Sequence, residues 1–483
     1  MCHLLNRYRY WGTSLTICCS EPIWGITEQR ICRQLPDAPL VGAYFGTEPA
    51  LIVQDPDLIK LVTTKDFYYF SGREISDHLH KEEYNQNLFS TYGDSWKVLR
   101  QNLSPIFSSS KLKTMYALIE NCSETFEKLL EKEISISRTQ EARDLIARYT
   151  MDCIGTCAFG IDTRAMGDES TNPFRRMGKQ FFDPSYSQVV SIILRAMWPS
   201  IFYKLGFKVF PDVVTVFFNK LMSEVFHERR CKKVSRNDLV NMVLNFEQNK
   251  YIFGDSLSNL KTGDKEKVKV DVDDRMLTVQ CFAFFTAGYE TSATTASFTL
   301  YELAKHPEAQ ERARREVREW LARRGGRLAY ECVSELPFLE QCVDEALRLY
   351  PVLGVITREV VEPYRFPGGP LLERGARVHI PVYHLHRHPT YFPDPEVYRP
   401  ERFAPENRST IHPYTYFAFG EGPRICIGMR FAKMQVFSGL ITILKNYRVE
   451  LAKGMSANIE FEPKSVVTSS KHGIQLNFIP LEY

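Results

Sequence analysis

The sequence predicts an α+β fold that is mainly α-helical and carries only a small β-sheet region. Residues 112–321 show long helical patterns, charged on one face and apolar on the other. Short strand-like runs lie far apart, near residues 41–54, 360–381 and 474–479, so a sheet must assemble from distant segments. No internal repeat or low-complexity block divides the chain, which predicts one continuous domain over residues 35–483.

Local signals give the elements in order. Asp55-Pro-Asp begins a short helix that runs to residue 62. A helix of some 30 residues begins at Asp273 or Asp274 and ends before His306-Pro307. After an irregular Pro-rich stretch, residues 429–445 form a buried helix. The expected strands cover residues 41–46, 49–54, 360–366, 376–381 and 474–479.

Composition excludes several classes of protein. The 61 basic and 58 acidic residues give a net charge of +3, so neither a strongly basic nucleic-acid binder nor an acidic tail protein is expected. With 44% hydrophobic and 25% charged residues the chain is typical of globular proteins. The 13% aromatic residues are enough for a large core or an aromatic-walled pocket.

The cysteines and histidines outside one loop indicate no metal site. Twelve cysteines are irregularly spaced without a Cys-x-x-Cys pair, which favours reduced thiols facing the cytosol. Cys153 and Cys157 are expected to be small buried residues. His384, His386 and His388 alternate without a Cys or carboxylate partner at a typical spacing, so a metal is not expected there.

Residues 1–34 form an atypical N-terminal segment. Its uncharged run covers only residues 10–20, whereas a membrane-spanning helix needs ~20 mostly apolar residues. The run also lacks the apolar core and small-residue cleavage site of a signal peptide. No membrane anchor is recognisable in this segment.

One cysteine stands in a different setting, in Phe419-Gly-Glu-Gly-Pro-Arg-Ile-Cys426-Ile-Gly428. The glycines permit tight turns, and a helix follows at once. Helix N-terminal amides stabilise a thiolate at such a position. A single soft thiolate without neighbouring Cys or His suits an axial haem ligand better than zinc. A buried Cys in a Gly-rich helix entry is the alternative.

This loop resembles the haem-binding loop of the cytochrome P450 family, in which Phe, Gly, Arg, Cys and Gly recur at this spacing. Other segments resemble the animal microsomal branch, with insect and other arthropod detoxifying members nearest. That branch carries an N-terminal anchor, which residues 1–34 do not show. Four further motifs stand in the family's order: Trp96-x-x-x-Arg100, Ala287-Gly-Tyr-Glu-Thr291, Glu345-x-x-Arg348 and Pro400-Glu-Arg402-Phe.

The resemblance implies the cytochrome P450 fold, a triangular prism with haem b between the long central helix and the helix after the Cys loop. Cys426 becomes the iron ligand, and Phe419 lies against the thiolate side. A second group ties the later helices to the Cys loop: Glu345, Arg348 and Arg402. A third group meets the haem propionates: Trp96, Arg100, Arg358 and Arg424.

The implied activity is that of a monooxygenase, which inserts one atom of O2 into a substrate. The chain has no dinucleotide fingerprint, so electrons must come from outside. The resemblance supplies NADPH–cytochrome reductase, with cytochrome b5 as a second donor, and places the protein on the cytosolic face of the endoplasmic reticulum membrane. The apolar residues 187–210 either belong to the core or, as the resemblance implies, meet the membrane surface. Cations flanking the motifs on the Cys side are candidates for reductase docking: Lys97, Arg100, Arg430 and Lys433.

The expected substrate is an apolar small molecule, and no nucleic acid is expected. Aromatic and aliphatic walls bind by burial rather than by charge. Two other functions stay open: a haem-thiolate enzyme that isomerises or rearranges peroxides, and a non-catalytic binder of haem or an apolar ligand. Relatives of the first kind tend to lose the acid–Thr pair that this chain keeps. The expected wall residues are Phe284, Phe285, Ala287, Val355 and Ile356.

Glu290 and Thr291 are the catalytic candidates. Glu290 is the only charge between residues 276 and 301, midway along the long helix. A buried, unpaired carboxylate is costly, so it needs a partner or a purpose. Thr291 can bond to a carbonyl one turn earlier and loosen the helix. We expect Thr291 to hold a water in place and Glu290 to feed a proton relay.

Overall fold

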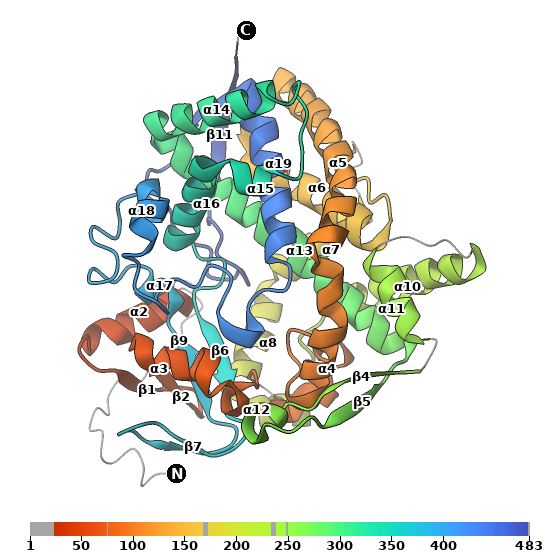
Figure 1. Cartoon of the computed structure of the whole chain (residues 1–483), viewed down its shortest axis with the longest axis vertical. Helices are drawn as coiled ribbons and strands as arrows, with labels where there is room; N and C mark the ends of the chain where they lie inside the picture. Colours follow the sequence, from red (N-terminus) through yellow and green to blue (C-terminus); the bar gives the residue numbers. More distant parts are fainter. Residues whose placement is uncertain (1–23, 75, 168–171, 233–237, 248–249, 482–483) are drawn as a thin grey trace.

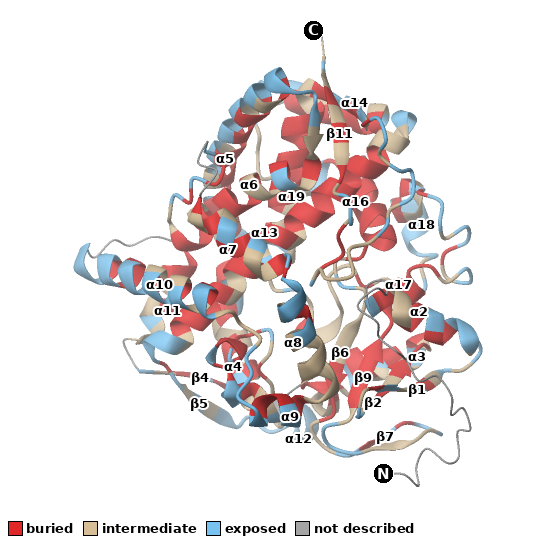
Figure 2. Ribbon diagram, turned by 180° about the vertical axis from the view of Figure 1, so that it is seen from behind, coloured by how far each residue is buried: buried red, intermediate tan, exposed pale blue. Residues whose placement is uncertain are grey.

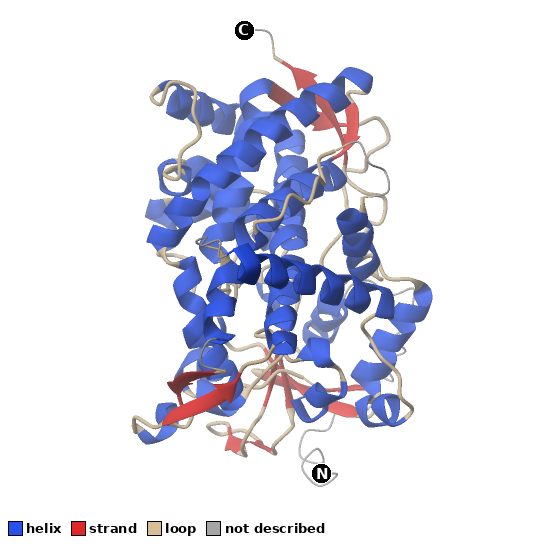
Figure 3. Ribbon diagram, turned by 90° about the vertical axis from the view of Figure 1, so that its right-hand side faces the viewer, coloured by secondary structure: helices blue, strands red, loops and turns tan. Residues whose placement is uncertain are grey.

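Long helices fill the middle of the molecule, and small sheets lie at its two ends (Figures 1 and 3). Within the described ranges no helix is both long enough and apolar enough to cross a membrane. The uncharged run at residues 10–20 lies outside these ranges. This computed structural model describes residues 24–74, 76–167, 172–232, 238–247 and 250–481.

The helices agree with the predicted helical dominance. The longer ones are α2 (Trp24–Gln34), α4 (Gly93–Leu103), α5 (Ser109–Ile136), α6 (Ala142–Ile154), α7 (Pro173–Phe182), α8 (Tyr186–Met197), α10 (Asp212–Lys232), α11 (Leu239–Glu247), α13 (Asp274–Lys305), α14 (Pro307–Ala322), α16 (Pro337–Leu349) and α19 (Met429–Asn446). Shorter turns are α3 (Pro56–Lys60), η1 (Leu61–Lys65), η2 (Phe67–Phe70), η3 (Ser76–Lys81), η4 (Glu83–Asn85), η5 (Ser104–Phe107), η6 (Gly155–Phe159), α9 (Pro199–Lys204), α12 (Asn259–Thr262), α15 (Cys332–Glu335), α17 (Val382–Leu385), η7 (Pro400–Phe403), α18 (Pro405–Arg408) and η8 (Gly422–Arg424).

The main sheet joins segments more than 300 residues apart, as predicted, in the order β1-β2-β9-β6. β2 and β9 are parallel, whereas the other two pairs are antiparallel. A second sheet has the order β10-β11-β3, and β4-β5 and β7-β8 are hairpins. The strands are β1 (Leu40–Phe45), β2 (Glu48–Val53), β3 (Thr139–Glu141), β4 (Tyr251–Asp255), β5 (Lys267–Asp271), β6 (Ile356–Glu359), β7 (Tyr364–Arg365), β8 (Leu371–Leu372), β9 (Arg377–Ile380), β10 (Tyr447–Leu451) and β11 (Gln475–Pro480).

The central helix α13 confirms its sequence prediction. Asp273 caps it, because its carboxylate accepts the N–H of Met276 at 2.8 Å, and Pro307 follows its last turn. Most of α13 is buried, as are large parts of α16 and α19 around it (Figure 2). A helix that is apolar on nearly all sides needs such a position.

Three predictions of the layout were wrong. The residues expected to be strand at 360–366 are mostly irregular, because β6 ends at Glu359 and β7 has two residues. The hairpin β4-β5 interrupts the segment predicted to be helical, since Lys and Val alternate along β5 with a period of two. The folded unit also begins before the predicted boundary at residue 35, because α2 buries Glu28 and Cys32.

A buried ion-pair network connects α16 to the stretch that precedes the Cys loop. Glu345 and Arg348 have no exposed side-chain area and lie 2.7 Å apart, Oε2 to Nε. Arg402 of η7 donates to Glu345 at 3.2 Å. Arg348 also donates to the carbonyls of His386 and Pro395 at 2.9 and 2.7 Å. The network therefore connects α16 with three points of the stretch from residue 386 to residue 402.

Replacing Arg348 with Ala tests this network. Glu345 would keep its charge in the core without its main partner, which costs about 3–5 kcal/mol of folding free energy. Urea denaturation of the purified protein measures the change. Lys113→Ala, which removes an exposed pair with Glu331, is the control and should leave the midpoint unchanged. An Arg348→Ala protein as stable as the control would contradict the structural role.

Candidate active site

The Cys loop runs from η8 into α19 in a tightly held conformation. The N–H of Cys426 donates to the carbonyl of Phe419 at 2.8 Å. Gly422 has a φ of +73°, and a Cβ there would lie 1.9 Å from the carbonyl oxygen of Thr63. Only glycine fits this close approach. The sequence pattern and the geometry agree that the loop presents one cysteine at the start of a helix.

The side chain of Cys426 has accessible surface area, although protein surrounds the loop that carries it. Burial in protein raises the pKa of its thiol, and the N–H of Gly428 and the charge of Arg100 oppose this effect. Most described cysteines are buried, among them Cys153 and Cys157, as predicted. Cys426 therefore faces an internal space while the loop and Arg100 favour its thiolate.

The central helix α13 has an exposed position in the middle of its length, Ala287. Thr291 lies one turn further on the same face, and its hydroxyl donates to the carbonyl of Ala287 at 2.7 Å. Phe284 lies one turn earlier, and its ring stacks on Phe107 with centroids 5.5 Å apart. A Cβ on Gly428 would lie 3.9 Å from the same Phe107 ring. Phe107 thus contacts both α13 and the start of α19.

Four arginines gather beside this space: Arg73, Arg100, Arg358 and Arg424. Burial lowers the pKa of Arg424, and the charges of Arg73, Arg358 and Arg100 lower it further. Burial also lowers the pKa of Arg358 to about 10 and that of Arg73 to about 9, the latter with a contribution from Arg358. The sequence analysis missed Arg73, because no spacing rule connects it with the Cys loop.

The cluster of these four arginines, here called the cation cluster, requires an anionic partner. Arg424 donates to the carbonyls of Phe89 and Thr91 and lies 4.6 Å over the Trp96 ring. The Nε atoms of Arg358 and Arg424 nevertheless have no hydrogen-bond partner among the described residues. Within those residues neither guanidinium forms a salt bridge with a carboxylate. Buried cations require paired anions, so the two carboxylates of haem fit this site.

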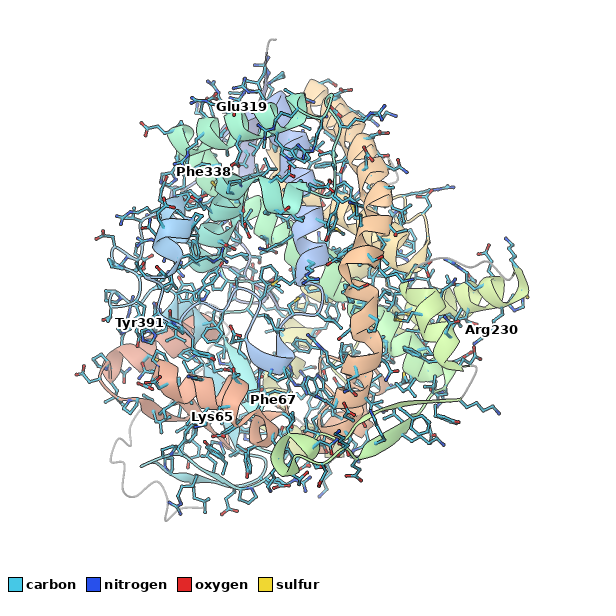
Figure 4. All side chains as sticks on the ribbon, in the orientation of Figure 1. Lys65, Phe67, Arg230, Glu319, Phe338 and Tyr391 are labelled. Atoms are coloured by element: carbon cyan, nitrogen blue, oxygen red, sulfur yellow. The ribbon has the colours of Figure 1, made fainter. Side chains whose placement is uncertain are left out.

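Trp96 is buried in α4 and packs against Phe67 (labelled in Figure 4), with ring centroids 5.3 Å apart. Arg100 lies one turn further along α4 and is half-buried. The charges of Arg100 and Cys426 act on each other, which indicates that α4 and the Cys loop are close together. The structure thus brings together the residues that the sequence analysis assigned to the haem.

The structure supplies a partner for Glu290, which is one of the two requirements expected of a buried carboxylate. Glu290 is buried, and its Oε1 accepts from Nε of Arg143 of α6 at 2.7 Å. Burial raises the pKa of Glu290, although Arg143 acts in the opposite direction. The side chain of Arg143 is 30% exposed, so the pair connects the interior of α13 with solvent. The sequence could not show this pair, because the two residues are 147 positions apart.

Phe285 is a core residue and does not line the exposed face of α13. Its position lies two residues from Ala287, which turns it about 200° around the helix. Its ring packs against the rings of Phe174, Phe218 and Tyr289. Phe284, Val355 and Ile356 are half-buried and remain available as wall residues, and Phe419, expected on the thiolate side, is half-buried as well.

The basic residues expected to dock the reductase differ in exposure and in whether they form an ion pair. Arg430 is exposed, whereas Lys97 is half-buried. Lys433 forms a 2.5 Å ion pair with Glu340, which neutralises its charge. The alternating histidines also show no metal arrangement: within the described ranges no cluster of His, Cys, Asp and Glu could hold a metal ion. His386 instead accepts the N–H of Phe417 at 2.8 Å and supports the Cys loop.

Comparisons with known proteins agree with this geometry. Residues 29–478 match the family model described as Cytochrome P450. "Cytochrome P450 6k1" of Blattella germanica is 36% identical over 452 residues, covering 92% of this chain and 85% of the relative. "Probable cytochrome P450 6a13" of Drosophila melanogaster is 35% identical over 463 residues, covering 95% and 89%. The chain therefore belongs to the cytochrome P450 family and is a haem-thiolate monooxygenase that binds haem b and uses O2, an organic substrate and a redox partner reductase.

Proposed function

We propose that Cys426 is the thiolate ligand of the haem and that Arg73, Arg100, Arg358 and Arg424 bind its propionates. The observation that carries this proposal is a cluster of buried guanidinium groups beside an exposed thiol. When bound, haem activates O2, and a thiolate ligand favours cleavage of the O–O bond. The rearranging enzyme and the non-catalytic binder are not favoured, since the family members are monooxygenases.

The chain supplies the protons from the other side of the space. The Thr291 hydroxyl donates its proton to the carbonyl of Ala287, which leaves its oxygen able to accept a hydrogen bond. It can therefore fix a water molecule above the Ala287 face. Burial raises the pKa of Glu290, which favours its role as a group that gives and regains protons. Arg143, partly exposed, is the proposed connection from Glu290 to solvent.

The proposed substrate is an apolar small molecule held by Phe284, Ala287, Val355 and Ile356. These residues contribute apolar area and no charge, so binding depends on burial. We also propose that the protein works on the cytosolic face of the endoplasmic reticulum membrane, with cytochrome b5 as a second electron donor. Exposed apolar side chains of α8, α9 and the turn that follows support contact with a membrane surface: Tyr186, Val190, Ile201, Leu205 and Phe207.

Replacing Cys426 with Ser removes the soft ligand while keeping the size of the side chain. The carbon-monoxide difference spectrum of the reduced protein should lose the red-shifted band of a thiolate-bound haem. Cys231→Ser changes an exposed cysteine on α10 and should keep the band. A Cys426→Ser protein that retains the band would refute Cys426 as the ligand.

Arg358→Met tests whether the cation cluster destabilises the haem-free protein and whether it helps to retain haem. In haem-free protein the variant should be more stable by about 1–3 kcal/mol, because a buried cation without an anion is removed. In haem-loaded protein the rate of haem release should rise. Arg229→Met is the matched control, because Arg229 is also buried but has Asp238 2.9 Å away, so its loss should destabilise the haem-free protein. A destabilised haem-free Arg358→Met protein would contradict the proposal.

Thr291→Ala tests the placement of water. The variant should keep haem and substrate but form at least about tenfold less product per NADPH consumed, with the electrons released as hydrogen peroxide, because proton delivery becomes uncontrolled. Thr295→Ala, one turn further along α13, removes a hydroxyl that donates to the carbonyl of Thr291 within the helix, and the variant should behave like the wild type. Unchanged coupling in Thr291→Ala would show that this hydroxyl has no part in the relay.

A further inference from the structure

A histidine lies between two carboxylates in the main sheet, away from the active-site space. His379 of β9 has no exposed side-chain area. Its Nδ1 lies 2.6 Å from Oε1 of Glu28, and its Nε2 lies 2.7 Å from Oε1 of Glu74. Neutral imidazole can donate through only one nitrogen. With both carboxylates ionised, both contacts are hydrogen bonds only when the ring carries two protons and a positive charge.

The three residues come from three separate segments. Glu28 belongs to α2, Glu74 follows the sheet-edge residue Gly72, and His379 lies in β9. The rings of Trp24 and Phe45 lie 5.3 and 5.1 Å from the imidazole and exclude water from it. Removing one member of a buried charged set leaves an uncompensated charge, which is strongly destabilising. This set therefore couples α2 and the Glu74 segment to the sheet.

The sheet register connects this set to the cation cluster. His379 is directly opposite Thr357 in β6, and Gly72 is bridged to Glu359 at the other edge of β6. Successive side chains along an extended chain point to opposite faces. Thr357 shares the face of His379, so Arg358 extends from the other face of β6. Arg73 precedes Glu74 and contributes to the same cluster as Arg358.

A second contact joins α2 to the wall of the active-site space. A Cβ on Gly25 would lie 2.8 Å from the Cα of Gly354, so the two backbones touch without room for a side chain. Gly354 directly precedes the wall residues Val355 and Ile356. A displacement of α2 would therefore reach both the wall and β6.

We propose that His379 is a positioning residue: between Glu28 and Glu74 it locks α2 and residues 72–74 onto the sheet and so holds Arg73 and Arg358 at the haem edge. The inference rests on the proposed role of those arginines and goes beyond it, because it assigns their placement to a buried ionic set outside the site. The set acts on haem retention and touches neither substrate nor haem.

The stabilisation by Glu28, His379 and Glu74 decreases as the pH rises. Burial by itself lowers the pKa of His379, but Glu28 and Glu74 outweigh it and raise the pKa to about 9. Because this value lies above the ~6.5 of a free histidine, the stabilisation is complete below ~6.5 and is lost as pH rises through about 9. Other charged or titratable groups facing the set are Cys32 of α2, Arg195 of α8, Glu48 of β2 and Arg377 of β9.

Haem release from the holoprotein tests the proposal, with haem transfer to excess apomyoglobin followed by absorbance from pH 7 to 10. The wild-type rate should increase at least about tenfold with an inflection near pH 9. His379→Gln should release haem rapidly over the whole range without that inflection. Glu74→Gln removes one carboxylate and should move the inflection to lower pH. His472→Gln, which removes an exposed histidine near Glu460, is the control and should match the wild type.

Hydrogen exchange at pH 7 tests the role of His379 in holding α2 independently of the haem-binding role proposed for the arginines. The amides of α2 should lose protection in His379→Gln and keep it in His472→Gln and in Arg358→Met. If α2 exchanges more rapidly while haem release stays unchanged, the set does not act on the haem edge and the proposal is wrong. A wild-type release rate that is flat from pH 7 to 10 also overturns it, even if His379→Gln yields no holoprotein.

Discussion

Burying a charge costs several kcal/mol unless an opposite charge or a set of hydrogen bonds accompanies it, and this constraint governs the molecule from the sheet to the active site. Arg348 is compensated by Glu345, Glu290 by Arg143, and His379 by two glutamates. The cluster around Arg424 instead leaves buried guanidinium nitrogens unpaired among the described residues. Ion pairs within the chain stabilise the fold, whereas the unpaired nitrogens of Arg358 and Arg424 support the proposed binding of the haem carboxylates at this cluster.

The central helix performs several tasks because its faces have different neighbours. The face of Ala287 and Thr291 meets the active-site space. The side of Phe285 packs into an aromatic core that holds the helix in place. Glu290 pairs with α6 between these two regions. A rigid helix can present a hydroxyl and a carboxylate at fixed distances from the Cys loop because its remaining surface is fully packed.

Prediction from sequence was accurate where a signal is local. The cap at Asp273, the Pro that follows α13 and the glycines around Cys426 act within a few residues. Prediction failed where contacts with residues far away in the sequence decide the surroundings of a side chain. Phe285 was assigned to the pocket because its residue type fits, but its angle around the helix places it in the core. Lys433 was assigned to a docking surface, but a neighbouring helix supplies Glu340.

The sequence by itself determined the family, because the short motifs have a specific order and spacing. The same motifs supplied the ligand-bearing loop and the catalytic pair that are proposed here. Only the tertiary structure decided the partner of Glu290, the membership of Arg73 in the cation cluster and the enclosure of His379 by Glu28 and Glu74. These pairings join residues up to 351 positions apart. Charge compensation acts through space over a few ångströms, so chain position carries no direct information about it.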